Sequence, residues 1–570
     1  MRRIKTLCLA AIAAGLLGSC GKHSAEISTL TPPHLEKRGS ATQLVVEEKP
    51  FLVLGCELGN STASSREYME EVWPKLKESG VNTVLAVVSW EQLEPEEGQF
   101  DFSVVDGLIS DARLHDMKLA LLWFGSWKNG ITSYTPTWVK RDTQRFPLAE
   151  TPEGKPLPIL STLGSETAKA DARAYAALMK HLKEVDAADQ TVIMMQIENE
   201  VGLHGHPRDY SPIAETAFQG EVPSELTTWL ASHKEELLPE TKAAWEANGN
   251  RMEGTWEEVF GVNDRASEIF MAWNYARYMD QIAAAGKEEY NIPTFVNAWI
   301  VQPEDTRPGN YPSGGPQAQN HDIWRAAAPH IDLLSPDIYL DDFPEVAQLY
   351  SRAGNALFIP ESRSGQNGAA NAAYAIGALN AIGYSPFGFE RNCDSETNDT
   401  FRQFYKKVSP VSDIILKAQA EDRIGAAWLK GSNPERVKDE IRLGDVRILC
   451  ELVSSGMRNG GAPQLTGGTY DPEAIGYLIA IQQEGEWLFL GSNVRVTFLP
   501  ADGEGYVGLA KVTEGDFNQE GQWKEGRWLN GDEIQLRYDL LYAVDEGFSG
   551  QGLNFGTPEP EFLKVELFNY

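Results

Sequence analysis

The 570-residue sequence predicts an α/β fold: a closed (β/α)₈ TIM barrel followed by a C-terminal β-sandwich. Two observations predict it. Short apolar runs alternate with longer segments whose apolar residues recur at helical spacing, which is typical of a parallel sheet with crossover helices. Beyond about residue 425 the helical spacing gives way to short strands separated by Gly-rich turns, the pattern of a β-sandwich.

Eight apolar runs are predicted to be the barrel strands. They are residues 51–57, 81–88, 119–124, 191–197, 293–299, 331–339, 356–361 and 383–390. Eight strand–helix units match a TIM barrel with insertions, such as the Trp- and Glu-rich segment at 203–265. An open doubly wound sheet is the competing fold. Such a sheet normally has a Gly-rich phosphate turn after its first strand, and residues 57–61 do not have that pattern.

Changes in composition and in hydrophobic periodicity divide the chain into four segments. Residues 1–20 are expected to be a signal peptide and 21–43 a polar tether. Residues 44–428 are expected to form the barrel and 429–570 the β-sandwich. Within the sandwich, strands are expected at 445–453, 475–482, 486–490, 495–499 and 533–544.

The N-terminus predicts export. A basic start precedes an apolar core that is too short to span a bilayer as a mature helix. The ending at 17–20 resembles a bacterial lipobox, in which Cys20 is lipidated. Ordinary cleavage that leaves Cys20 as a plain thiol is the alternative. We therefore expect an exported protein of the cell envelope, which contacts the membrane only through a lipid anchor.

Composition limits the partners and cofactors. A formal net charge of −32 repels nucleic acid and suits a neutral substrate, here an oligo- or polysaccharide. The chain has neither a CxxC pair nor an HExxH motif, so we predict no metal and no cofactor. Cys56 and Cys393 are expected at the ends of neighbouring barrel strands, as two buried thiols or as a disulfide. The composition does not indicate the oligomeric state.

The fourth predicted strand ends in an unusual way. The apolar run at 191–197 is followed by Glu198, Asn199 and Glu200, and in a TIM barrel the chemistry lies where the strands end. In an extended strand Glu198 and Glu200 point the same way and Asn199 points opposite. Glu200 is the preferred functional carboxylate, with Glu198 as the alternative, and solvated charges at a strand end are the third interpretation.

Other predicted strands also end in functional groups. They are Trp127, Trp299, Tyr339, Glu361 and Glu390, at strands three, five, six, seven and eight. Aromatic rings stack on sugar faces, and carboxylates bind hydroxyl groups, so this set indicates a carbohydrate pocket. Each aromatic residue is equally compatible with packing at the barrel rim. Glu361 is also compatible with a structural ion pair to Arg363.

These strand ends resemble the clan of (β/α)₈ retaining glycosidases. In that clan an Asn-Glu pair ending strand four carries the acid/base, and a Glu ending strand seven is the nucleophile. Residues 196–202 and 90–102 are similar to signatures of the family 35 β-galactosidases, and family 42 shares the second in looser form. Residues 136–139 resemble a further family 35 segment. The chain departs from family 35 at Val201, where Tyr is usual, and at 125–129, where a Glu that contacts galactose is absent.

The resemblance implies a retaining exo-glycosidase that releases terminal β-D-galactose. Glu361 is then the nucleophile, kept ionised by hydrogen bonds from Tyr339 and Arg363, and Glu200 is the general acid and base. Asn199 is expected to donate to the sugar 2-hydroxyl. Trp127, Trp299, Tyr339 and Glu390 are expected as further substrate contacts because they end predicted barrel strands.

Two alternatives remain open. One is a retaining glycosidase for another β-linked sugar, such as an arabinoside, fucoside or glucoside. The other is a non-catalytic sugar-binding lipoprotein. The C-terminal domain resembles the accessory β-domains of bacterial relatives, and the sequence assigns it no activity.

Overall fold

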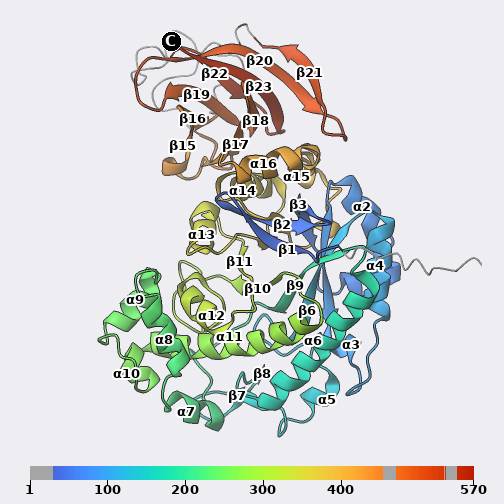
Figure 1. Ribbon diagram of the computed structural model, residues 1–570, viewed down its shortest axis with the longest axis vertical. Coiled ribbons are helices and arrows are strands. Elements are labelled where there is room, and N and C mark those ends of the chain that lie inside the picture. The colour runs from blue at the N-terminus through green and yellow to red at the C-terminus, as the bar shows by residue number, and fades with distance from the viewer. Residues whose placement is uncertain (1–29, 454–469, 530, 532, 535–548) are drawn as a thin grey trace, which may run out of the picture.

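A computed structural model describes residues 30–453, 470–529, 531, 533–534 and 549–570 (Figure 1). The expected signal peptide and its Cys20 lie outside the described residues, and so does most of the strand expected at 533–544.

A closed barrel of eight parallel strands forms the centre of the molecule, as predicted. Its strands in chain order are β4 (Val53–Glu57), β5 (Thr83–Ser89), β6 (Lys118–Lys128), β9 (Val192–Asn199), β10 (Thr294–Trp299), β11 (Leu333–Ile338), β12 (Ile359–Ser362) and β13 (Gly383–Pro386). Each overlaps one of the eight predicted runs. Because they are buried on both faces, these strands are almost continuously apolar.

Helices follow the strands and cover the barrel (Figure 1). The helices that follow β4 to β9 are α1 (Arg66–Met69), α2 (Val72–Glu78), α3 (Trp90–Leu93), α4 (Ser103–Leu114), α5 (Thr137–Lys140), α6 (Ser165–Asp186), α7 (Pro212–Phe218), α8 (Ser224–Ser232), α9 (Pro239–Glu246), α10 (Trp256–Phe260) and α11 (Asp264–Glu289). Those that follow β10 to β13 are α12 (His321–Ala327), α13 (Phe343–Tyr350), α14 (Gly365–Ala378), α15 (Asp399–Val408) and α16 (Ser412–Ala420). The insertion expected at 203–265 contains α7 to α10, and a two-stranded ribbon, β7 (Leu148–Glu150) and β8 (Pro156–Leu160), precedes α6.

A small antiparallel sheet packs at the end of the barrel where its strands begin. It consists of β1 (His34–Arg38), β2 (Ala41–Val46) and β3 (Lys49–Phe51). Leu44 and Val46 join the apolar core inside the barrel, and the side chain of Gln43 donates to the carbonyl of Leu416 at 2.7 Å. The prediction of a tether up to residue 43 is therefore wrong for 34–43, because these residues pair as strands and β2 is buried.

The C-terminal domain consists of two antiparallel sheets around one core. One sheet orders β14 (Ile424–Lys430), β17 (Ile475–Gln482), β18 (Trp487–Ser492), β23 (Glu561–Asn569), β20 (Val507–Phe517) and β21 (Trp523–Trp528). The other orders β15 (Lys438–Leu443), β16 (Val446–Leu452), β19 (Val494–Pro500) and β22 (Gly552–Phe555). The domain begins at β14, slightly before the predicted boundary at 429. Four predicted strands coincide with β16 to β19, whereas β14, β15 and β20 to β23 were not predicted.

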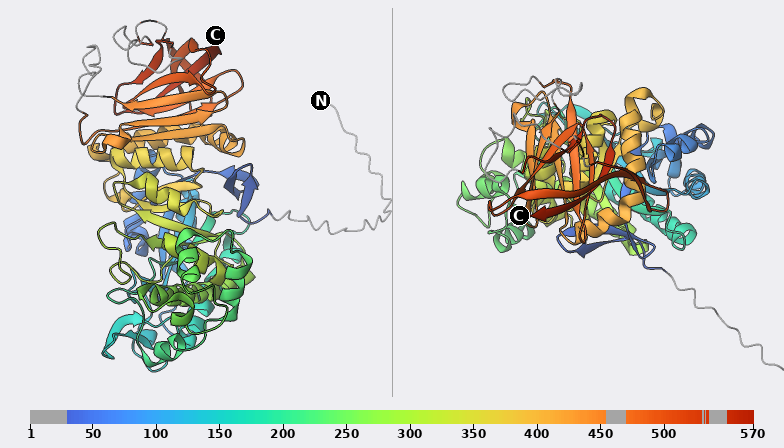
Figure 2. Two further views of the ribbon diagram at one scale, coloured as in Figure 1. Left: turned by 90° about the vertical axis from the view of Figure 1, so that its left-hand side faces the viewer. Right: turned by 90° about the horizontal axis from the view of Figure 1, so that it is seen from above.

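The two domains share a hydrophobic core. The sandwich lies at one end of the long axis, above α14 to α16 (Figure 2). Trp428 on β14 and Tyr477 on β17 belong to the same apolar cluster as the barrel helices. The indole N–H of Trp428 also donates to Asn371 on α14 at 3.0 Å. The barrel helices and the sandwich therefore pack against each other through an apolar interface.

The thiols of Cys56, Cys393 and Cys450 are free and buried. Of the two alternatives for Cys56 and Cys393, the structure has the pair of thiols. Among the residues that the structure describes, no helix has both the length and the apolar character needed to cross a bilayer.

Candidate active site

Three carboxyl groups meet at the carboxyl end of the barrel. Glu200 follows β9, Asp337 lies on β11 and Glu361 lies on β12, where it pairs in register with Asp337. One oxygen of each lies within 4.8 Å of the others. Glu200 and Glu361 are 7% and 5% exposed. The fold therefore brings together the two glutamates that the sequence singled out.

The backbone at the end of β9 separates the two neighbouring glutamates. Glu198 and Glu200 have positive φ angles of 57° and 44°, a conformation that non-glycine residues rarely adopt outside constrained sites. These turns break the alternation of an extended strand. The relation expected for an extended strand therefore does not hold at this strand end: Asn199 and Glu200 both face Glu361, and Glu198 does not.

The Glu198 carboxylate belongs to the scaffold around β6. It accepts hydrogen bonds from the backbone N–H groups of Gly125 at 3.1 Å, Ser126 at 2.8 Å and Trp127 at 2.8 Å. Complete burial, together with the adjacent carboxyl of Asp171, raises the pKa of Glu198 well above its usual range. Glu198 thus fixes the end of β6, and the alternative that made it the functional carboxylate has no support in this geometry.

The buried carboxyl groups of Glu198 and Asp171 leave no room for a side chain at Gly125. We therefore expect Gly125→Ala to destabilise the fold. An added Cβ would lie 2.5 Å from Glu198 Oε1 and 2.8 Å from Asp171 Oδ1. Overpacking of this kind costs about 1–3 kcal/mol, measurable as a lower midpoint of urea unfolding. Gly107→Ala is the control, because its Cβ would meet only an ordinary contact at 3.5 Å in the middle of α4. Equal midpoints for the two variants would contradict the proposed crowding.

Three donors surround the Glu361 carboxylate. The side-chain NH₂ groups of Asn199 and Asn297 each donate to Oε1 at 3.2 Å, and the Tyr339 hydroxyl donates to Oε2 at 3.0 Å. The expected contact with Tyr339 is confirmed.

Arg363 does not contact Glu361 in the way that the sequence suggested. Its guanidinium pairs with Asp341 at 2.9 Å. The expected hydrogen bond from Arg363 to Glu361 is therefore wrong, and so is the alternative in which Glu361 is a structural partner of Arg363.

The electrostatic environment makes Glu200 a weak acid. Burial, and then the charge of Glu361, raises the pKa of Glu200 to about 8, while the nearby Lys128 ammonium opposes this rise. Burial and the charge of Glu361 also raise the pKa of Glu57 and of Asp337 well above the usual range. At neutral pH, Glu200 therefore carries a proton beside Glu361.

The sequence did not select four residues that complete this centre. They are Glu57, Lys128, Asn297 and Asp337, and all four are buried at the carboxyl ends of barrel strands. Their position was a usable signal, because each is among the last three residues of its barrel strand. A polar residue at such a place is as common in packing as in catalysis, so the sequence pattern alone did not separate the two.

The predicted aromatic contacts have different outcomes. Trp127 is 1% exposed and packs edge-on against Tyr275 and Tyr278 of α11. Its assignment as a substrate contact is therefore wrong, because its side chain lies between β6 and a helix. Trp299 is half-buried at the end of β10 and packs edge-on against His204, while Tyr339 is 37% exposed above Glu361. Both remain accessible rim residues.

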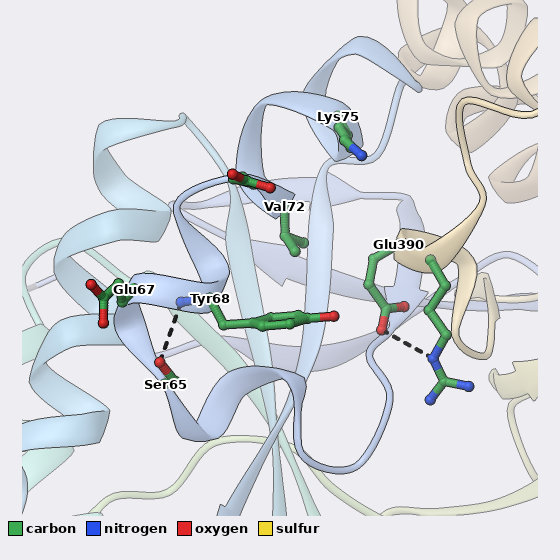
Figure 3. A pocket seen from close by; sticks show the side chains of 8 residues that line it. Ser65, Glu67, Tyr68, Val72, Lys75 and Glu390 are labelled. Atoms are coloured by element: carbon green, nitrogen blue, oxygen red, sulfur yellow. Dashed lines mark hydrogen bonds and ion pairs between the residues drawn. The ribbon is translucent and has the colours of Figure 1, made fainter.

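Glu390 lies in a different place from the carboxyl cluster. Its Oε1 accepts from the backbone N–H of Gly59 and from the Thr62 hydroxyl, both at 2.9 Å. It lines a separate cavity of about 500 Å³, together with Tyr68 and Arg391 (Figure 3). The prediction that Glu390 binds the same substrate as Glu200 is therefore not supported, since Glu390 holds the loop after β4.

Among the described residues, the cluster of Glu200, Asp337 and Glu361 is close enough to hold a cation. The groups around it argue against that use. Glu361 already accepts N–H and O–H donors from Asn199, Asn297 and Tyr339, and donors directed at a carboxylate compete with a metal ion for the same lone pairs. The arrangement suits the attack of a carboxylate on an electrophile, beside a second carboxyl that holds a proton.

Comparison with known proteins gives a family for part of the barrel. Residues 60–304 match the family model described as Beta-galactosidase, that of glycoside hydrolase family 42. Residues 401–540 match a domain of unknown function, DUF5597. A β-galactosidase of Arthrobacter sp. is 26% identical over 205 residues, which are 34% of this chain and 27% of that protein.

Solved structures give distant matches. The β-galactosidase of Bacillus circulans sp. alkalophilus has a TM-score of 0.43 at 15% identity, over 64% of this chain and 57% of that one. The catalytic domain of the Paenibacillus polymyxa β-amylase also has a TM-score of 0.43, at 12% identity, over 62% and 96%. Because these TM-scores are below 0.5, the family relationship rests on the sequence match.

The matched segment contains β5, β6, β9 and β10, and with them Lys128, Asn199, Glu200 and Asn297. It ends before Asp337 and Glu361. The family to which residues 60–304 point is therefore family 42, whereas the motifs at 90–102 and 196–202 resemble family 35.

Proposed function

We propose that this protein is a retaining exo-glycosidase that releases terminal β-D-galactose from a neutral oligo- or polysaccharide. The observation that carries the proposal is the short approach of two carboxyl groups, one of which, Glu200, has a raised pKa. Oxygens of Glu200 and Glu361 lie within 4.8 Å of each other. Retaining glycosidases hold their two carboxyl groups about 5–5.5 Å apart, whereas inverting enzymes leave about 6.5–9.5 Å for a water molecule.

In the first step Glu361 attacks the anomeric carbon. The bond between an Oε of Glu361 and C1 forms as the bond from C1 to the leaving oxygen breaks. Glu200 gives its proton to that oxygen, which leaves as an alcohol. The environment supports these roles, because three donors stabilise the Glu361 carboxylate and burial keeps the proton on Glu200.

In the second step a water molecule replaces the leaving group. Glu200, now ionised, takes a proton from the water, whose oxygen bonds to C1 while the ester to Glu361 breaks. Loss of the negative charge on Glu361 in the covalent intermediate lowers the pKa of Glu200, since that charge is one cause of its rise. Glu200 is thereby converted from an acid to a base at the stage that requires it.

The choice of galactose rests on the family match and on the motifs at 90–102 and 196–202. Asn199, Trp299 and Tyr339 are the proposed sugar contacts, with Asn199 donating to the 2-hydroxyl. Another β-linked sugar, such as an arabinoside, fucoside or glucoside, keeps the same mechanism and changes only these contacts.

A panel of p-nitrophenyl glycosides tests the proposal, with the protein lacking residues 1–20. We expect release from the β-galactoside, and no release in Glu361→Ala. Retention is read from the anomer that forms first, by proton NMR. Preference for another β-glycoside would contradict the galactose assignment and leave the proposed mechanism unchanged. No release from any member, with binding of intact oligosaccharides retained, would favour a non-catalytic sugar-binding protein.

We also propose that the protein is exported and anchored through a lipid on Cys20, so that its substrate is a glycan met in the cell envelope. The sequence at 1–20 supports this. Membrane fractionation of the full chain and of Cys20→Ser checks it: only the unaltered chain is expected in the membrane fraction, and equal distribution would contradict the anchor.

A further inference from the structure

Lys128 is a buried cation at the carboxyl end of β6. It is 9% exposed, and its ammonium donates to Oδ1 of Asn199 at 2.8 Å. It also lies 5.3 Å from the centre of the Phe124 ring. Lysine is rarely buried unless it is paired, so a lysine placed here indicates a specific role beside the carboxyl cluster.

The contact with Lys128 decides which end of the Asn199 amide faces Glu361. An ammonium group has only donors, so it accepts nothing from the NH₂ end of an amide. The carbonyl end of Asn199 must therefore face Lys128, and its NH₂ end then points to Glu361, which it reaches at 3.2 Å.

Asn297 shows how the second amide of the site is fixed. Its Oδ1 accepts from the backbone N–H of Glu200 at 3.0 Å, and its NH₂ donates to Asp337 at 2.7 Å and to Glu361 at 3.2 Å. The backbone thus sets the orientation of Asn297. For Asn199 the corresponding constraint comes from one side chain, that of Lys128.

We propose that Lys128 is a positioning residue, which orients the Asn199 amide so that its NH₂ is presented to Glu361 and to the substrate's 2-hydroxyl. The inference rests on the proposed function. It assigns a role to Lys128 at the end of the third strand of the barrel, a strand that lacks the family 35 glutamate.

The charge of Lys128 has a second consequence at Glu200. The groups that face Glu200 are Glu361 and Asp337, from β12 and β11, Glu57 from β4 and Lys128 from β6. The Lys128 ammonium and a hydrogen bond with Asp337 both lower the pKa of Glu200, and of the facing groups Lys128 is the one that does so through a positive charge. Removing this charge raises that pKa, and the alkaline limb of the activity profile moves to higher pH.

A double-mutant cycle on the glycoside that is hydrolysed best tests the positioning role. We expect Lys128→Met to lose about 10- to 100-fold in kcat/KM, the range for one hydrogen bond that involves a charge. Asn199→Ala is expected to lose at least as much. If Lys128 acts through Asn199, the double variant is no slower than Asn199→Ala. Losses that multiply would overturn the proposal.

The pH profile separates positioning from general damage. Lys128→Met is expected to be slower and to have its alkaline limb at higher pH. Lys128→Arg keeps the charge and is expected to leave the limb in place. Lys169→Met, which removes an exposed lysine of α6, is the control and should change neither quantity. An unmoved limb in Lys128→Met would contradict the role of the charge.

A spectroscopic titration keeps this test independent of turnover. The protonated carboxyl band of Glu200 is obtained from infrared difference spectra against Glu200→Gln. It is expected to titrate at higher pH in Lys128→Met, and in Lys128→Arg as in the unaltered protein. This titration does not require hydrolysis. If the proposed function is wrong, the glycoside panel shows no hydrolysis but the titration still shifts. If the Lys128 assignment is wrong, the titration does not shift and the losses in the double-mutant cycle multiply.

Discussion

Glu361→Ala is expected to reduce kcat on p-nitrophenyl β-galactoside by at least about 10⁴-fold, since removal of a catalytic nucleophile has effects of this order. The variant loses the atom that bonds to C1, and Asn199, Asn297 and Tyr339 lose the acceptor they share. A 2-fluoro-glycoside should form a stable ester with the unaltered enzyme, and mass spectrometry of its peptides should place the label on Glu361.

The matched control for this variant is Asp341→Asn. It alters a carboxylate near the barrel rim that pairs with Arg363 and is well exposed. We expect its kcat to stay within about threefold of the unaltered enzyme, because surface ion pairs contribute little. A label on another carboxylate, or substantial turnover by Glu361→Ala, would show that Glu361 is not the nucleophile.

Glu200→Gln is expected to slow hydrolysis of alkyl glycosides by about 10²–10⁴-fold, the usual contribution of general acid catalysis. Activated aryl glycosides need no protonation to leave, so their first step is expected to change much less. The measurement is the pre-steady-state burst of nitrophenol against the steady-state rate for alkyl galactosides. Equal losses on both substrate types would contradict the acid role.

The pH dependence of the unaltered enzyme belongs to the same prediction. The pKa of Glu200 is raised to about 8 by burial and by the charge of Glu361. A general acid is active in its protonated form, which is present below its pKa and lost as the pH rises through it. The kcat/KM of the unaltered enzyme should therefore fall above about pH 8, and Glu200→Gln should lack this alkaline limb. A limb that persists in the variant would belong to another group.

The barrel was predictable because its signal is local. Each strand is a short apolar run with a helical stripe after it, and eight such units have one common closed arrangement. The functional strands were recognisable for the same reason, since Glu200 and Glu361 each stand where an apolar run ends. The sheet of β1 to β3 was missed because Ala41–Val46 is buried through contacts with residues far along the chain, among them Leu416.

The side-chain directions were not predictable from the pattern. Strand alternation gave the wrong relation between Glu198 and Glu200, because the two positive φ angles depend on the β6 backbone that receives Glu198. Trp127 is an aromatic residue at a strand end, as a sugar contact would be, but its ring packs against α11.

The sequence by itself determined the fold class, the place of the site and the pair of residues at its centre, because hydrophobic periodicity and strand ends are properties of neighbouring residues. Only the tertiary structure decided which of Glu198 and Glu200 lies beside Glu361, which end of the Asn199 amide faces Glu361 and how strongly Glu200 holds its proton. These depend on the distances and burial of Lys128, Glu200 and Glu361, and groups on different strands acquire such distances only when the barrel closes.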